Sequence, residues 1–134
     1  MIDFEFFGVK EIPIKHNLYW IKKIISSEKK ILGKIVFVFC NDAYLLTKNI
    51  QFLNHNTLTD IITFDYCNER KISGDILISI ERVKENSKIY NVTFLNELDR
   101  VMVHGLLHLL GYNDKTIDEK KTMRSKEDFY LSIK

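Results

Sequence analysis

Residues 94–110 read FLNELDRVMVHGLLHLL, a long apolar segment that carries His104 and His108 in its second half. Apolar residues recur there at the spacing of an α-helix, and the leucines around the histidines predict that the helix is buried. We expect the helix to end at Gly111, shortly before Asp114. The segment therefore predicts a core helix with two imidazoles on one face and a sharp turn after it.

The spacing of these residues indicates a metal site. Side chains four residues apart lie on one face of a helix, with Cβ atoms about 5–6 Å apart. The imidazoles of His104 and His108 can thus converge on one cation at about 2.0–2.1 Å per bond. The glycine turn would bring Asp114 back, so that it adds a carboxylate oxygen. Three protein ligands leave a fourth position for water, which is typical of a catalytic rather than a structural zinc site.

The histidine pair also has a purely structural interpretation. A histidine on an apolar helix is often a core or surface residue with a hydrogen-bond partner, and two at this spacing also occur by chance. The glycine turn and the carboxylate that follow make chance a poorer explanation. A buried imidazole pair is also costly to keep unless it is used. The whole pattern favours the metal site.

The rest of the chain predicts one small, mostly four-stranded sheet packed with helices. Alternating or continuous β-branched and aromatic residues predict strands at 2–7, 34–40, 60–66 and 74–80. Helical spacing predicts helices at 16–30, 43–52, 81–90, 94–110 and 116–134. The short polar connection 67–73 allows the last two strands to pair as a hairpin. We predict an α+β fold (an α/β-like sandwich), with the metal site on the long apolar helix and the turn after it.

The last predicted helix is highly charged and carries a few large apolar residues. We expect it to fold back on the body of the protein through Met123, Phe129, Tyr130 and Ile133.

Composition is that of an ordinary globular chain, with 134 residues, 46% of them hydrophobic and 28% charged. This length suits a single domain covering residues 1–134. The chain has no apolar run near the roughly 18 residues that span a bilayer, and its N-terminus does not read as a secretion signal. Cys40 and Cys67 lie far apart, which favours reduced thiols and a cytoplasmic location. A net charge of +2 permits RNA binding without arguing for it.

The histidine pattern resembles the H-E-x-x-H-x-x-G-x-x-H motif of metzincin proteases, glycine included. Gly105 stands where those proteases carry the glutamate that acts as general base, so a peptidase mechanism loses its base. Asp114 stands where they carry a third histidine, which keeps a ligand and changes its charge. A site with a carboxylate is less cationic, so we expect it to acidify bound water less than an all-histidine site.

Three blocks of the sequence resemble one family, the YbeY endoribonucleases of bacterial rRNA maturation. HGLLHLLGYND (104–114) is similar to the family's H-G-x-L-H-L-x-G-Y signature, which is far more specific than two spaced histidines. TDIITF (59–64) is similar to its T-D-V-L-S-F strand, and GDILIS (74–79) to its G-D-I-x-I-S strand. The blocks keep the family's order, and the resemblance covers nearly the whole chain.

The resemblance implies a zinc-dependent endoribonuclease with one zinc ion bound by His104, His108 and Asp114. The family usually has histidine at the third ligand, so Asp114 is a variant. The implied reaction is cleavage of phosphodiester bonds in single-stranded RNA, with zinc acidifying water and polarising a phosphoryl oxygen. The implied role is 16S rRNA 3′-end maturation and ribosome quality control. The expected partners are therefore a 16S rRNA precursor and the ribosome or its small subunit, in the cytoplasm, with no membrane and no DNA.

Four positions concern the chemistry beyond the metal. Many family members carry an arginine, thought to face the RNA or the reacting phosphate, at the position that Leu53 occupies here. Either another cation contacts the phosphate, or the catalytic rate is low, or the metal and the backbone take this role. Asp60 and His55 are candidates for the general base, with a strand-end role for Asp60 and a solvated loop position for His55 as the alternatives. Tyr112 stacks on a base or packs the turn, and we expect packing.

Other interpretations stay open at this point. A non-enzymatic ribosome assembly factor would use zinc only to hold the histidine helix to its turn. A metal-dependent hydrolase of a different substrate is compatible with the missing arginine. In a purely structural protein the histidines would bind no metal at all. Cleavage of unstructured RNA that chelation abolishes would exclude the first, and elemental analysis of the purified protein would test the last.

Overall fold

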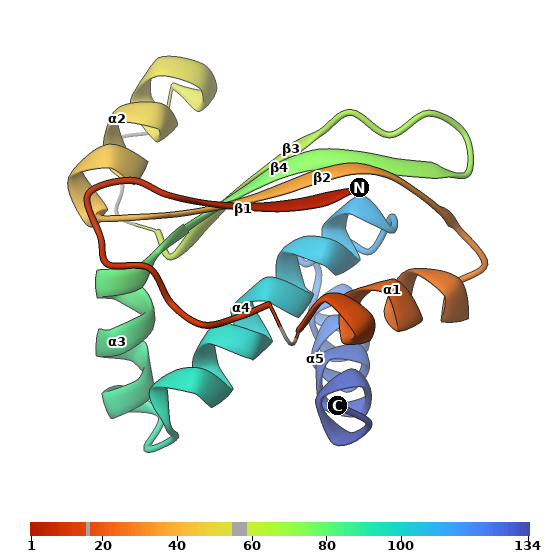
Figure 1. Ribbon diagram of the computed structural model, residues 1–134. Helices are drawn as coiled ribbons and strands as arrows, with labels where there is room; N and C mark the ends of the chain where they lie inside the picture. Colours follow the sequence, from red (N-terminus) through yellow and green to blue (C-terminus); the bar gives the residue numbers. More distant parts are fainter. Residues whose placement is uncertain (16, 55–58) are drawn as a thin grey trace.

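A four-stranded mixed sheet forms the centre of the fold (Figure 1). In the computed structural model, which describes residues 1–15, 17–54 and 59–134, the strands are β1 (Ile2–Phe6), β2 (Ile31–Cys40), β3 (Ile61–Asp65) and β4 (Lys71–Ser79). Their spatial order is β1-β2-β4-β3, with β1, β2 and β4 parallel. β3 runs antiparallel to β4 at one edge, with Ile62 opposite Leu77. The predicted hairpin is therefore confirmed.

The described residues form five helices around this sheet: α1 (Asn17–Ser27), α2 (Asp42–Leu53), α3 (Ile80–Ile89), α4 (Phe94–Leu109) and α5 (Ile117–Ser132). Helices α1, α3, α4 and α5 lie on one face of the sheet, while α2 lies at one end of the other face (Figure 1). The predicted α+β class is confirmed, and the element ends differ from the predicted ones by at most three residues. None of the helices described here is long and apolar enough to cross a membrane.

The side chains of β2 divide between two hydrophobic cores. Successive residues of a strand point to opposite faces of a sheet. Phe37 and Phe39 point into the larger core, which α1, α4 and α5 complete. Val38 and Cys40 point into a smaller core that Leu45 of α2 covers. The strand is buried on both faces, which explains why its sequence is continuously apolar rather than alternating.

Helix α5 packs against the larger core with a narrower face than the sequence suggests. Met123, Tyr130 and Ile133 contact that core as predicted, but Phe129 is 54% exposed. At 3.6 residues per turn, Tyr130 lies within about 20° of Met123 around the helix axis, whereas Phe129 lies about 120° away. The prediction for Phe129 was therefore wrong because its angular position points it to solvent.

Helix α4 approaches β3 and β4 closely at Gly105. A Cβ atom at this position would lie 2.7 Å from side-chain atoms of both Ile61 and Ile76, too close for any substituent without a shift of the neighbours. The glycine thus lets the histidine helix lie directly on the sheet. The same contact leaves no space for the glutamate that metzincin proteases carry here, which agrees with the loss of a peptidase mechanism.

Candidate metal centre

The turn between α4 and α5 is defined at both ends. The N–H of Gly111 donates to the carbonyl of His108 (3.1 Å), and the N–H of Tyr112 donates to the carbonyl of Leu107 (3.0 Å). These are the two hydrogen bonds of a Schellman motif, and the φ of +103° at Gly111 is one that glycine adopts without steric penalty. Thr116 then begins α5 with a capping box. The short segment between, which holds the predicted third ligand, is thereby turned back toward α4.

Three potential ligand atoms meet at this turn. The Nε2 atoms of His104 and His108 are 3.1 Å apart. Oδ2 of Asp114 lies 3.2 Å from Nε2 of His104 and 3.5 Å from Nε2 of His108. In a tetrahedral site with bonds of about 2.0–2.1 Å, neighbouring ligand atoms are about 3.3 Å apart. The triangle therefore has the size of one face of a zinc coordination tetrahedron, and these residues could hold a metal ion.

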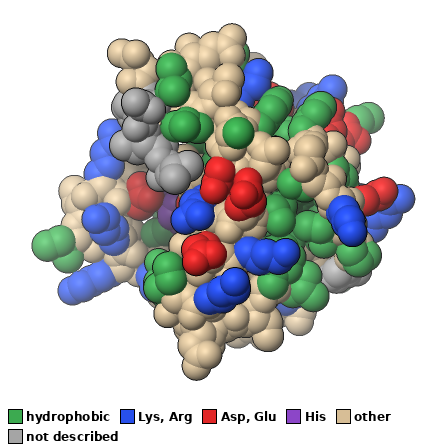
Figure 2. Space-filling view, turned by 90° about the vertical axis from the view of Figure 1, so that its left-hand side faces the viewer, with side chains coloured by type: hydrophobic (Ala, Val, Ile, Leu, Met, Phe, Trp, Pro, Cys, Tyr) green, Lys and Arg blue, Asp and Glu red, His purple; other side chains and the backbone are tan. Residues whose placement is uncertain are grey.

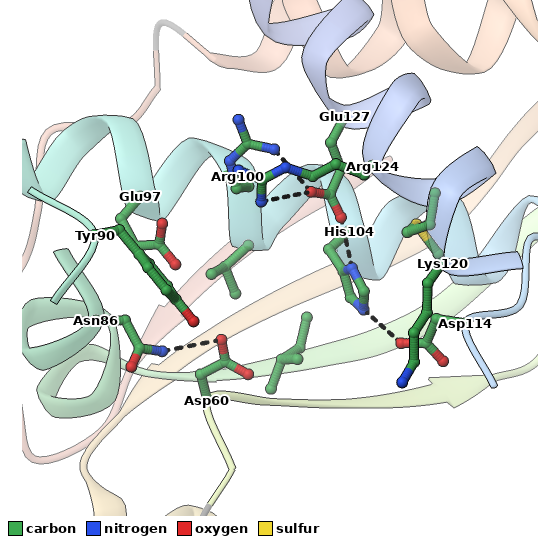
Figure 3. Close-up of a pocket in the computed structure, with 13 residues that line it drawn as sticks. Asp60, Asn86, Tyr90, Glu97, Arg100, His104, Asp114, Lys120, Arg124 and Glu127 are labelled. Carbon is green, nitrogen blue, oxygen red and sulfur yellow. Dashed lines mark hydrogen bonds and ion pairs between the residues drawn. The ribbon is translucent and has the colours of Figure 1, made fainter. Parts of the chain in front are cut away.

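A buried carboxylate orients one of the imidazoles. Glu127 of α5 is 5% exposed, and its Oε2 lies 2.7 Å from Nδ1 of His104 (Figure 3). A proton on Nδ1 is then shared with the carboxylate, which leaves the lone pair of Nε2 directed at the ligand triangle. Arg100 donates to Glu127 (2.9 Å) and to Asp128 (2.8 Å). The positive charge of Arg100 thereby compensates the buried charge of Glu127, and the carboxylate of Glu127 fixes the orientation of the His104 ring.

The surroundings shift the pKa values of the two histidines in opposite directions. Burial alone would lower the pKa of His104, but the hydrogen bond and charge of Glu127, together with Asp114, raise it above its usual value. Burial and the neighbouring His104 lower the pKa of His108. Because metal binding requires neutral imidazoles, protons compete with a metal first at His104 as the pH falls.

Glu28, just beyond the end of α1, ties the turn to α5. Its carboxylate accepts hydrogen bonds from Tyr112 (2.6 Å), Lys126 (3.2 Å) and Tyr130. Burial would raise the pKa of Glu28, but these three donors lower it overall. Tyr112 also packs against the larger core, so it packs the turn, as expected. Sequence reasoning did not find Glu28, because its partners lie far away in the chain.

Two hollows flank the ligand triangle, and His104 and Asp114 line both. We call the first the α5 hollow; it has a volume of about 400 Å³ and lies between α3, α4 and α5 (Figure 3). We call the second the β3 hollow; it has a volume of about 740 Å³ and lies along β3. The α5 hollow is lined in part by Asp60, Asn86, Tyr90, Glu97, Arg100, Lys120 and Glu127. The β3 hollow is lined in part by Leu53, Thr59, Thr63, Asp65, His108, Asn113 and Lys115.

The surface around this region carries charges of both signs. Figure 2 shows a histidine side chain recessed among basic and acidic side chains on the face at the α2 and α3 end of the molecule. Acidic and basic groups are interspersed over this face rather than gathered into one patch. The lysine and arginine side chains therefore form no continuous basic track in this view.

Two other candidates from the sequence, Asp60 and Leu53, line the hollows beside the triangle. Asp60 lines both hollows; its carboxylate accepts from Asn86 (3.5 Å), and its carbonyl accepts from the N–H of Ser79 (2.9 Å). Burial raises the pKa of the Asp60 carboxyl. The aspartate thus has the strand-end role that was the alternative, and a role as general base stays a prediction. Leu53 lines the β3 hollow, and His55 lies outside the described residues.

Comparisons with known proteins agree over nearly the whole chain. Residues 8–133 match a family model described as Endoribonuclease YbeY. Endoribonuclease YbeY of Flavobacterium psychrophilum is 53% identical over 98% of this chain and 91% of that protein. The protein of the same name from Bacteroides fragilis is 40% identical, over 99% of this chain and 97% of that protein. A solved structure, TM1509 from Thermotoga maritima, matches with a TM-score of 0.72 at 26% identity, over 98% of this chain and 87% of TM1509.

Proposed function

The chain belongs to the YbeY endoribonuclease family, and from this premise we propose that it cleaves single-stranded RNA at a zinc ion held by His104, His108 and Asp114. The names of the relatives supply the reaction class. The observation that carries the proposal is the triangle of ligand atoms with sides of 3.1, 3.2 and 3.5 Å. Its donor set of two imidazoles and one carboxylate suits zinc, and two hollows open beside it.

A divalent ion in this place supplies Lewis acidity to a phosphodiester and lowers the pKa of water. The residues of the chain do the positioning. In the neutral imidazole of His104, Glu127 holds the proton on Nδ1 and so leaves Nε2 free to bind a metal, and the Schellman turn holds Asp114 opposite the two rings. Because the hollows meet at the triangle, a single strand can pass across it with one nucleotide on each side. Unpaired bases can turn into two separate hollows, whereas the bases of a duplex stay stacked and paired, which supports the preference for single strands.

We propose that Lys120 takes the place of the family's arginine toward the phosphate. Lys120 lines the α5 hollow, as Asp114 does (Figure 3). No residue in the described ranges forms an ion pair with its ammonium group. Arg100, in contrast, is already bound to Glu127 and Asp128. Lys120 is thus a cation near the triangle that can neutralise a phosphate without losing an existing partner.

The proposal includes a biological substrate. From the family resemblance we infer a 16S rRNA precursor as substrate, cleaved during 3′-end maturation and ribosome quality control. The ribosome or its small subunit is then the partner, and the cytoplasm the place of action. Neither DNA nor a membrane has a part in this scheme.

The decisive experiment uses purified protein and an oligonucleotide that spans the 3′ end of 16S rRNA with its precursor extension. Elemental analysis identifies the bound metal first. We expect cleavage of the single strand, loss of cleavage after chelation, and recovery on addition of zinc. The same sequence as a perfect duplex and as single-stranded DNA should stay intact. A peptide and a small phosphodiester test for other hydrolase activities.

Two results would contradict the proposal. If the protein contains zinc and loses stability on chelation but leaves every RNA intact, the alternative of an assembly factor with a structural zinc holds. If it cleaves the small phosphodiester or the peptide and not the RNA, it is a metal-dependent hydrolase of another substrate. Protein that is folded and binds no metal contradicts both the proposal and these alternatives.

A further inference from the structure

Glu97 is a buried acid that the proposed reaction does not use. It lies on α4 two turns before His104 and is 4% exposed, and its carboxylate points into the α5 hollow (Figure 3). Among the residues that the structure describes, none donates a hydrogen bond to this carboxylate or forms an ion pair with it. Burial raises the pKa of Glu97. The carboxylate oxygens stay accessible from the hollow, so they can accept hydrogen bonds from an incoming ligand.

The rest of the α5 hollow offers the contacts that a flat heterocycle needs. The ring of Tyr90, which is 63% exposed, lies at one side of the hollow (Figure 3). Beside it, the amide of Asn86 donates a hydrogen bond to the carboxylate of Asp60. Val101 and Met123 contribute apolar surface. The volume of about 400 Å³ lies within the range of about 300–1,000 Å³ for small-molecule sites. Aromatic faces together with a few polar groups are how proteins bind unstacked bases of single-stranded RNA.

We propose that the α5 hollow binds one nucleobase of the RNA, next to the cleaved phosphodiester, and that Glu97 recognises the Watson–Crick edge of that base. The inference rests on the proposed function. Since His104 and Asp114 line both hollows, a nucleotide bound at the triangle has its neighbour within the α5 hollow. Glu97 then acts as a residue that determines base preference, while the metal ligands determine where the chain is cut.

Guanine fits this site best among the four bases. Its N1–H and N2–H donors lie side by side, so the two oxygens of one carboxylate can accept both. Uracil presents a single N–H between two carbonyl oxygens, and these oxygens would face a carboxylate with no hydrogen to share. We therefore expect the strongest contrast between guanine and uracil at this position. A paired donor contact of this kind contributes roughly 5- to 150-fold in discrimination, from about 1–3 kcal/mol.

The test uses four RNA oligonucleotides that consist of uridine except for one central G, A, C or U. For zinc-loaded protein we expect kcat/KM for cleavage beside the central base to be about 10-fold or more higher for G than for U. In Glu97→Gln, where one acceptor oxygen becomes a donor, this ratio should fall below about 2-fold. Glu85→Gln, an exposed position on α3, loses the same charge away from the hollow and should keep the wild-type ratio. Thermal unfolding and zinc content establish that each variant is intact.

A second measurement is independent of catalysis and of the Gln variant. Chemical-shift titrations of the wild type and of Tyr90→Ala with guanosine 5′-monophosphate and uridine 5′-monophosphate report binding directly. We expect tighter binding of the guanosine nucleotide to the wild type, with shifts at Glu97 and Tyr90, and weaker binding to Tyr90→Ala. Equal cleavage of all four oligonucleotides overturns the inference and leaves the proposed function standing. If no oligonucleotide is cleaved, the proposed function fails, and equal affinity for the two nucleotides then overturns the base site as well.

Discussion

The α5 hollow and the β3 hollow lie on either side of the same ligand triangle, yet they are built differently. Three helices wall the α5 hollow, and two of its acids, Glu97 and Glu127, are almost completely buried. The β3 hollow runs along an edge strand, and polar side chains that line it, such as Asp65, Asn113 and Lys115, are exposed. Electrostatic interactions are stronger where water is excluded. We therefore expect substitutions on the α5 side to have larger effects than those on the β3 side.

The largest effect is expected where the two hollows meet. Asp114→Ala removes one of the three proposed metal ligands, so we expect the dissociation constant for zinc to rise by more than about 100-fold, beyond the effect of losing an outer hydrogen bond. RNA cleavage should fall in parallel. Competition titration with a zinc chelator measures the affinity. Asp118→Ala, four residues on and exposed, is the matched control. Unchanged zinc affinity in Asp114→Ala would falsify the triangle as a metal site.

The next effect tests the α5 side alone. Glu127→Gln keeps the size of the side chain and removes the charge that holds the Nδ1 proton of His104, so we expect zinc affinity to fall by about 10- to 100-fold. Nitrogen NMR of the imidazoles should show a mixed tautomer in place of a protonated Nδ1. Asp128→Asn alters the other acid that binds Arg100 and should bind zinc nearly as the wild type does. If the two variants have the same zinc affinity, the hydrogen bond between His104 and Glu127 does not make the α5 side more sensitive to substitution.

A smaller effect is expected at Glu28, whose hydrogen bonds hold the turn between α4 and α5 against α5. Glu28→Gln weakens hydrogen bonds from Tyr112, Lys126 and Tyr130, and bonds to a charged group contribute about 1.5–3 kcal/mol. We expect the free energy of unfolding at pH 7 to fall by about that amount. The pKa of Glu28 is lowered in the folded protein, so its contribution is complete above the unfolded value of about 4.3 and is lost as the pH falls through the lower folded value.

Urea denaturation at pH 7, 5 and 3 measures this difference. The gap between wild type and Glu28→Gln should be the same at pH 7 and 5 and should shrink at pH 3. A gap that grows on acidification would mean that the carboxylate destabilises the folded state. Glu69→Gln, an exposed position, controls for the general loss of one negative charge.

The smallest effect is expected on RNA affinity, when one lysine from each hollow is replaced. We expect Lys120→Ala to weaken RNA binding several-fold and to reduce the slope of log affinity against log salt concentration by about 1, as for a single phosphate contact. Lys115→Ala on the β3 side should change both quantities less. Fluorescence anisotropy with a labelled single strand at several salt concentrations gives the slopes. A larger effect at Lys115 would reverse the comparison and place the phosphate in the β3 hollow.

Local patterns were enough to predict much of this protein. Apolar periodicity located the strands and helices within three residues of their ends, because secondary structure depends mainly on neighbours in the sequence. His104 and His108 share a helix face by spacing alone, and Gly111 turns the chain by its own backbone freedom. These short-range rules brought Asp114 to the imidazoles, so the ligand triangle was predictable before any tertiary contact was known.

Only the tertiary structure decided which acids surround that triangle and which remain exposed. Glu127 is 23 residues from His104 in the chain, and Glu28 is 84 residues from Tyr112. In the sequence they look like any charged residue of a surface helix. Whether a carboxylate is buried, paired or left open to a ligand, as Glu97 is, depends on which helices pack together. Packing also set the exposure of Phe129, since helix orientation is chosen by the whole core rather than by one side chain.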